Sequence, residues 1–162
     1  MPIHRMIVVV LAFLTTPLLA QQSAPPAPDF DYFRAYVQPI FTTKRDGNAR
    51  CVSCHSVREQ MHLQPLPDGL GTWDEADARA NFNMARAYVV PGDPDASRLL
   101  LHPLAYAAGG DHHHDGGKHW TSKDDPEWQT LAAWVRGATL HSAAMPTDLK
   151  TRIIQTNSAG DS

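Results

Sequence analysis

The feature that most constrains this chain is the five-residue segment Cys51-Val52-Ser53-Cys54-His55. Its pattern, C-x-x-C-H, is typical of the attachment site of c-type haem. Thiols at this spacing can add to the two vinyl groups of one porphyrin, and the histidine that follows then binds the iron as the proximal ligand. A chain with a covalent haem must fold around a large flat group, so the motif limits both fold and chemistry.

Other functions of a C-x-x-C pair fit the sequence less well. The chain has two cysteines, both in this motif, and chance would place them so with a following histidine in about one case in a thousand. A thioredoxin-like redox pair needs alternating strands and helices, which are not visible here. A structural zinc site needs four N or S ligands, and a disulfide at this short spacing gains little loop-closure entropy. The sequence favours haem attachment, with zinc binding and a simple disulfide as the alternatives.

The ends of the chain differ in composition from its middle. Residues 1–20 have a weakly positive start, an apolar run over 6–14 and a small residue at position 20, which is typical of an export signal. The apolar run is far shorter than the roughly 20 residues of a membrane span. We therefore expect a signal peptide over 1–20, a proline-rich spacer over 21–28, one folded domain over 29–141 and a polar tail over 142–162.

This reading predicts an exported, periplasmic protein with no stable membrane span in its mature chain. The formal charge is −3, with no basic or acidic block in the sequence. Nucleic-acid binding needs a basic face, so we expect no nucleic-acid partner.

Helical patterns dominate the folded domain, and no strand pattern is convincing. A first helix is expected over 29–42, with a kink or an early end at Pro39. The haem motif is expected on a short helical turn. A long helix is expected from near Thr72 to position 87 or 88, because Thr72 and Glu75 have the spacing of a capping box.

Two further helices are expected nearer the C-terminus. A short one covers about 96–102, and the last begins at Asp125, with Pro126 at the first helical position, and ends at Gly137. The sequence thus predicts an all-α domain of about four helices packed around one covalent haem. Large apolar side chains are expected in the core or against the haem, chiefly Phe33, Val37, Trp128 and Trp134.

The ligand on the other face of the iron is expected from the histidine-rich segment 109–119. Its glycines allow the backbone to approach a flat ring closely. His114 is the first choice, His119 and His113 are the next, and Met145 is the leading residue of another type. Met61 and His62 lie so close in sequence to the proximal histidine that surface or packing roles are expected for them.

Four segments carry a resemblance to a known family. They are the pre-motif stretch "VQPIF", the motif "CVSCH", the middle segment "VPGDPDASRLL" and the late segment "DDPEWQTLAAWVRGA", within about residues 30–138. Together they resemble the single-haem c-type cytochrome domains, with a class I-like fold, and within them the planctomycete-type group. In many of those, a methionine in an M-P-P-like loop binds iron, whereas this chain has "HHHDGGKHW" there.

A variant of the group carries H-G-G-G-K in this loop, and residues 114–118 are similar to it. The resemblance implies Cys51 and Cys54 as thioether sites, His55 as the proximal ligand and His114 as the distal ligand. It implies one haem c as the cofactor, with its iron held by the two histidines.

We therefore expect an exported electron carrier that exchanges single electrons with redox partner proteins, alone or as a subunit of a larger redox complex. It is expected to be a carrier rather than a catalyst in its own right. Histidines on both faces would place its potential below that of a His/Met cytochrome. The alternatives are a haem-based sensor or peroxidase-like enzyme with an exchangeable distal ligand, and a histidine-rich metal-binding protein without haem. Haem propionates could pair with Arg98, Lys118, Arg50 or Arg58, or these side chains could be solvated surface charges.

Overall fold

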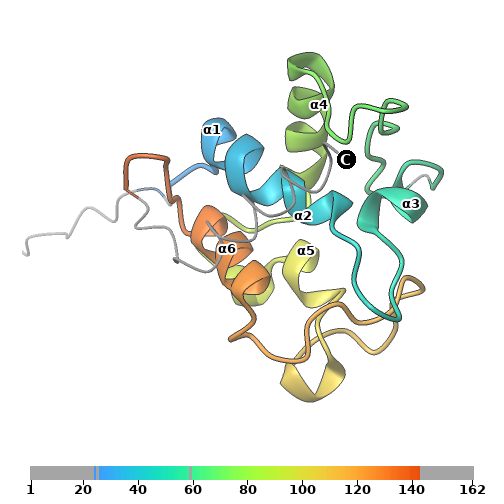
Figure 1. Ribbon diagram of the computed structural model, residues 1–162. Helices are drawn as coiled ribbons and strands as arrows, with labels where there is room; N and C mark the ends of the chain where they lie inside the picture. Colours follow the sequence, from blue (N-terminus) through green and yellow to red (C-terminus); the bar gives the residue numbers. More distant parts are fainter. Residues whose placement is uncertain (1–23, 25, 59, 143–162) are drawn as a thin grey trace, which may run out of the picture.

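The computed structural model describes residues 24, 26–58 and 60–142. Within this part of the chain the secondary structure is helical, with isolated β-bridges and no β-strand, which confirms the prediction of an all-α fold (Figure 1). The expected signal peptide, half of the spacer, the tail beyond residue 142 and with it Met145 lie outside the described residues.

The first helical run is continuous but irregular. It consists of α1 (Phe30–Tyr32), a π-helical turn (Phe33–Val37) and α2 (Gln38–Thr42). The Asp29 carboxylate caps its start by accepting a hydrogen bond from the Tyr32 N–H at 2.7 Å. Pro39 lies in the first turn of α2, so the distortion expected at this proline takes the form of the π-helical turn before it.

The C-x-x-C-H motif forms its own short helix, α3 (Cys51–His55), as expected. The long helix α4 (Glu75–Arg86) follows, but its cap differs from the prediction. Asp74 has the extended backbone of a cap residue, and its carboxylate accepts a hydrogen bond from the Asp77 N–H at 2.9 Å. The capping box at Thr72 was therefore wrong, because the backbone turns into the helix two residues later.

The remaining helices confirm the expected order. A 3-10 turn (Pro94–Ala96) leads into α5 (Arg98–Leu101), and α6 (Pro126–Val135) is capped by Asp125 with Pro126 in its first turn. Gly137 follows the end of α6 with a φ of +89°, a left-handed conformation that favours glycine. No helix within the described residues is both long enough and apolar enough to cross a bilayer.

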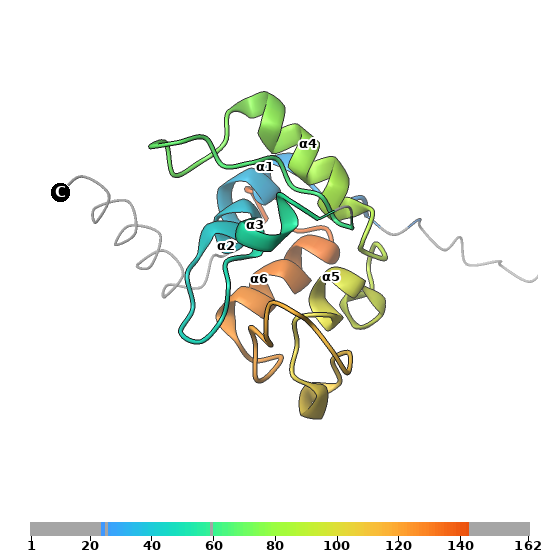
Figure 2. The same ribbon diagram turned by 90° about the vertical axis from the view of Figure 1, so that its right-hand side faces the viewer.

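The core lies where α6 packs against the first helical run and α5, and Figures 1 and 2 show α6 between them. Phe33, Val37, Trp128 and Trp134 are all buried, which confirms them as core residues. Phe33 lies 5.4 Å from Trp134 between ring centres. The Trp134 indole N–H donates to the Asp29 carbonyl at 2.9 Å, which ties the last helix to the start of the domain.

We expect Leu100→Ala to lower the free energy of unfolding by about 2–5 kcal/mol, because it leaves a cavity at a fully buried position. Urea denaturation followed by circular dichroism measures this loss. Leu70→Ala is the matched control, since Leu70 is 68% exposed and its truncation should change stability by less than about 0.5 kcal/mol. Equal effects of the two substitutions would contradict the described packing.

Candidate functional site

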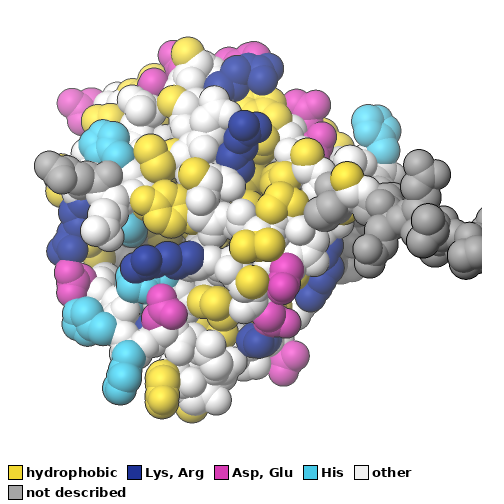
Figure 3. Space-filling model, turned by 180° about the vertical axis from the view of Figure 1, so that it is seen from behind, with side chains coloured by type: hydrophobic (Ala, Val, Ile, Leu, Met, Phe, Trp, Pro, Cys, Tyr) yellow, Lys and Arg dark blue, Asp and Glu magenta, His cyan; other side chains and the backbone are white. Residues whose placement is uncertain are grey.

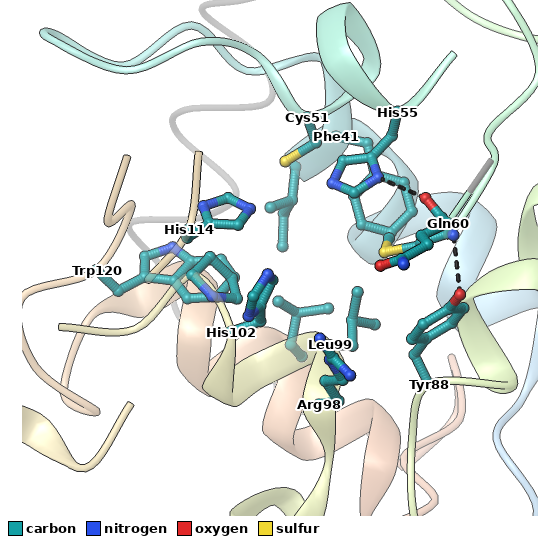
Figure 4. A pocket seen from close by; sticks show the side chains of 14 residues that line it. Phe41, Cys51, His55, Gln60, Tyr88, Arg98, Leu99, His102, His114 and Trp120 are labelled. Atoms are coloured by element: carbon teal, nitrogen blue, oxygen red, sulfur yellow. Dashed lines mark hydrogen bonds between the residues drawn. The ribbon is translucent and has the colours of Figure 1, made fainter. Parts of the chain in front are cut away.

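A cavity that is partly open to solvent lies beside the C-x-x-C-H motif (Figure 4). Helices α2, α3, α5 and α6 and the histidine-rich loop all contribute to its wall. An adjoining hollow, also partly open to solvent, continues from it along the motif. The two share six lining residues: Cys51, His55, Gln60, Arg98, His102 and His114. Cys54 lines the adjoining hollow, so both motif thiols face the same continuous space.

The two cysteines form no disulfide with one another. They lie three residues apart on one helical turn, which places them on the same side of α3. Burial raises the pKa of the Cys51 thiol to about 11, so this thiol is neutral at ordinary pH. A dithiol redox centre depends on a lowered thiol pKa, and burial does the opposite here.

His55 is held by the chain that returns after α3. Its Nδ1–H donates to the Gln60 carbonyl at 3.2 Å, and the Leu63 N–H donates to the His55 carbonyl at 2.9 Å. A carbonyl can only accept, so this hydrogen bond places the ring proton on Nδ1 and leaves Nε2 as a free electron-pair donor. Burial lowers the pKa of His55, which favours the neutral imidazole that a metal ligand needs.

His114 is held in the same way by its own loop. Its Nδ1–H donates to the Gly117 carbonyl at 2.5 Å, and burial lowers its pKa. Gly117 has a φ of +85°, and a Cβ there would overlap the side-chain oxygen of Asn48. Glycine is thus required at the residue whose carbonyl orients the His114 ring.

The two imidazoles face one another across the cavity. Their ring centres are 6.4 Å apart and their planes are inclined by 18°, and Figure 4 shows a ring nitrogen of each turned toward the other. Two imidazoles that bind one metal through bonds of about 2 Å have ring centres about 6 Å apart. With this spacing His55 and His114 could together hold the iron of a haem.

This fit does not require a larger ligand cluster. The described residues contain no group of three or more His, Cys, Asp or Glu side chains placed to hold a metal ion. Two facing histidines beside two thiols are the donor set that a covalent haem needs from the protein.

The competing histidines have other contacts. His113 has 82% of its side chain exposed and bonds the Asp115 carboxylate at 2.6 Å, at the rim of the adjoining hollow. His119 lies 5.5 Å from His114 between ring centres, and burial, with the nearby Arg45 charge, lowers its pKa to about 4. Figure 3 shows histidines beside basic and acidic side chains on the face opposite that of Figure 1.

Two further residues line the cavity, although neither was a leading ligand candidate. His102 follows α5 and lies 4.8 Å from His114 between ring centres, and its Nδ1 contacts the Asp111 carboxylate at 2.8 Å. Met61 packs on the cavity wall with a φ of +51°, rare for a non-glycine residue. The spacing of neither residue signals this position, because it depends on how distant segments meet. The expected core aromatics Trp128 and Trp134 do not line the cavity.

A buried ion pair links three of the segments that surround the cavity. The Arg45 guanidinium donates to the Glu127 carboxylate, through Nε at 2.8 Å, and only 12% and 10% of the two side chains are exposed. The same carboxylate accepts a hydrogen bond from the Trp120 indole N–H at 3.2 Å. Segments before the motif, after the histidine-rich loop and in α6 therefore meet at one carboxylate.

Comparisons of the chain with protein-family models, with curated proteins and with solved structures found no match.

We expect Glu127→Gln to lower the free energy of unfolding by about 3 kcal/mol or more, because it leaves the Arg45 charge buried without its partner. Glu75→Gln is the matched control, because its pair with Arg79 on α4 is more than half exposed. Such surface pairs contribute about 0–1 kcal/mol. Urea denaturation of both variants measures the difference, and a small loss for Glu127→Gln would show that the pair is hydrated in solution.

Proposed function

We propose that this chain is a single-haem c-type cytochrome that carries single electrons between redox partner proteins. In this proposal Cys51 and Cys54 hold the haem through thioether bonds, and His55 and His114 bind its iron. One observation carries the proposal: two neutral imidazoles face one another at a spacing that suits a metal, beside a cavity that Cys51 lines and an adjoining hollow that both motif cysteines line.

The bound haem would supply one-electron chemistry between Fe(III) and Fe(II). The protein orients both ligands through their Nδ1–H groups, which donate to the carbonyls of Gln60 and Gly117. Such bonds fix the tautomer and the ring orientation and raise the basicity of Nε2. Two histidine ligands favour a lower potential than a histidine and a thioether.

The cavity wall is also largely apolar. Its apolar members include Ile40, Phe41, Leu99, Leu131 and the buried face of Trp120. A low-dielectric wall tunes the potential of an enclosed metal and limits access of other ligands to it. Both effects suit a carrier, whose site should exchange electrons and not ligands.

The proposal extends to the fold and the location. The helix-rich domain is in keeping with a class I-like cytochrome fold, and the export signal expected over 1–20 is in keeping with haem attachment outside the cytoplasm. We propose that the protein acts in the periplasm.

A second candidate, a sensor or peroxidase-like enzyme, is supported by His102. This histidine lies beside His114 and contacts the Asp111 carboxylate, an arrangement that can move a proton if the distal ligand leaves. Rapid carbon monoxide binding by the reduced protein would favour this candidate, whereas a spectrum that carbon monoxide leaves unchanged favours the carrier.

The primary test is the intact mass of the full chain after expression with a haem-maturation system. We expect the mass of one porphyrin added to the polypeptide, and its loss in a Cys51→Ala/Cys54→Ala variant, because both thioether bonds are then absent. Cys51→Ser and Cys54→Ser single variants separate the two attachment points. An unmodified mass for the wild-type chain would refute the proposal.

We expect His114→Ala to convert the oxidised protein from low-spin to largely high-spin iron, because the distal ligand is removed. Low-temperature electron paramagnetic resonance measures the change. His113→Ala is the matched control, since that neighbouring side chain is exposed and bonded to Asp115. A low-spin signal that survives His114→Ala but not His119→Ala would move the distal assignment to His119.

A further inference from the structure

Two side chains at the cavity have N–H or O–H groups that donate to no acceptor among the described residues. The Arg98 guanidinium lines both the cavity and the adjoining hollow, and it has no ion-pair or hydrogen-bond partner among the described residues. The Tyr88 hydroxyl also lines the cavity and accepts a hydrogen bond from the Met61 N–H at 2.9 Å. Its own hydrogen has no acceptor within the described part of the chain.

The segments that carry these two donors are neighbours in the fold. Tyr88 follows the end of α4, and Arg98 is the first residue of α5. The backbone joins them directly, because the Leu99 N–H donates to the Tyr88 carbonyl at 2.9 Å. Figure 4 shows both side chains on the same side of the cavity, away from His114.

Most of the other cations near the cavity have partners among the described residues. Lys118 donates to the backbone carbonyls of His102, at 2.8 Å, and Asp111. Arg58 pairs with Asp115 at 2.6 Å, and Arg45 pairs with Glu127. Arg50 lines only the adjoining hollow, so Arg98 is the cation of the main cavity whose charge no described carboxylate offsets.

We propose that Arg98 and Tyr88 form a binding corner for a carboxylate. A guanidinium presents parallel N–H groups that match a carboxylate, and a tyrosine hydroxyl adds a third donor. This inference rests on the proposed function, and its ligand is a propionate carboxylate of the bound porphyrin. A free carboxylate from solution has the same chemistry and is the other source to be distinguished.

The corner has a measurable consequence for the haem. A positive charge beside a carboxylate keeps that group ionised and neutralises it locally. Without Arg98 the carboxylate keeps its negative charge at pH 7, which favours the oxidised, more positive iron. Without Arg98, the ratio of reduced to oxidised haem iron at a fixed ambient potential should therefore fall.

The test uses the full haem-bearing chain as wild type, Arg98→Gln, Arg98→Lys and Tyr88→Phe. We expect Arg98→Gln to lower the reduced-to-oxidised ratio about three- to tenfold at pH 7, where tenfold corresponds to 59 mV for one electron. Arg98→Lys should retain most of the ratio, and Tyr88→Phe should lower it less. Arg79→Gln is the matched control, since Arg79 pairs with Glu75 on α4 outside both hollows.

A pH series separates loss of a carboxylate partner from general damage. In Arg98→Gln the carboxyl should protonate at a higher pH, so its ratio should match wild type at low pH and fall below it as pH rises. Other titratable groups are present in every variant: His55, His102 and His114 line the same cavity, and Asp111 contacts His102. The effect of Arg98 is therefore the difference between the pH profiles of the variant and the wild type.

Each outcome decides the proposal. An unchanged ratio and pH profile in Arg98→Gln would remove the corner while leaving the haem assignment intact. If acetate shifts the ratio of wild type but not of Arg98→Gln at equal ionic strength, the corner binds free carboxylate and the propionate assignment is wrong. A wild-type chain without porphyrin would end the proposed function itself. If Arg98→Gln does not fold, an unchanged ratio in Tyr88→Phe at every pH overturns the corner.

Discussion

The buried carboxylate of Glu127 is the contact on which the arrangement of the site depends. It accepts hydrogen bonds from Arg45, which precedes the C-x-x-C-H motif, and from Trp120, which follows the histidine-rich loop. Both donors come from segments without regular secondary structure, whereas Glu127 lies in the first turn of α6. The helix therefore sets the distance between the two segments that carry His55 and His114.

Further contacts close the histidine-rich loop. Leu104 and Trp120 form an isolated parallel bridge at its base, and the Ala105 N–H donates to the Trp120 carbonyl at 2.8 Å. The loop also meets the motif side directly, because Gly117 lies against Asn48. The exposed pair between Arg58 and Asp115 spans the rim, where it contributes little to stability. Buried contacts at the base, and not the ion pair at the rim, hold the loop that presents His114.

Local signals in the sequence predicted the helices well. Pro126 after Asp125 fixes the start of α6 because the proline needs no donor there and the carboxylate caps the free N–H groups. The same reasoning placed the cap of α4 at Thr72, whereas Asp74 performs it, since the cap position depends on where the incoming loop turns. A sequence pattern predicts that a helix exists more accurately than it predicts the residues at which the helix begins and ends.

The site divides in the same way. The sequence by itself determined the motif on one helical turn, the order of the helices and the histidine-rich segment, because all of these depend on neighbours along the chain. Only the tertiary structure decided that His114 faces His55, that His102 and Met61 line the cavity and that Arg98 and Tyr88 lie together. These contacts join different segments of the chain, and helix packing and buried polar bonds set their distances.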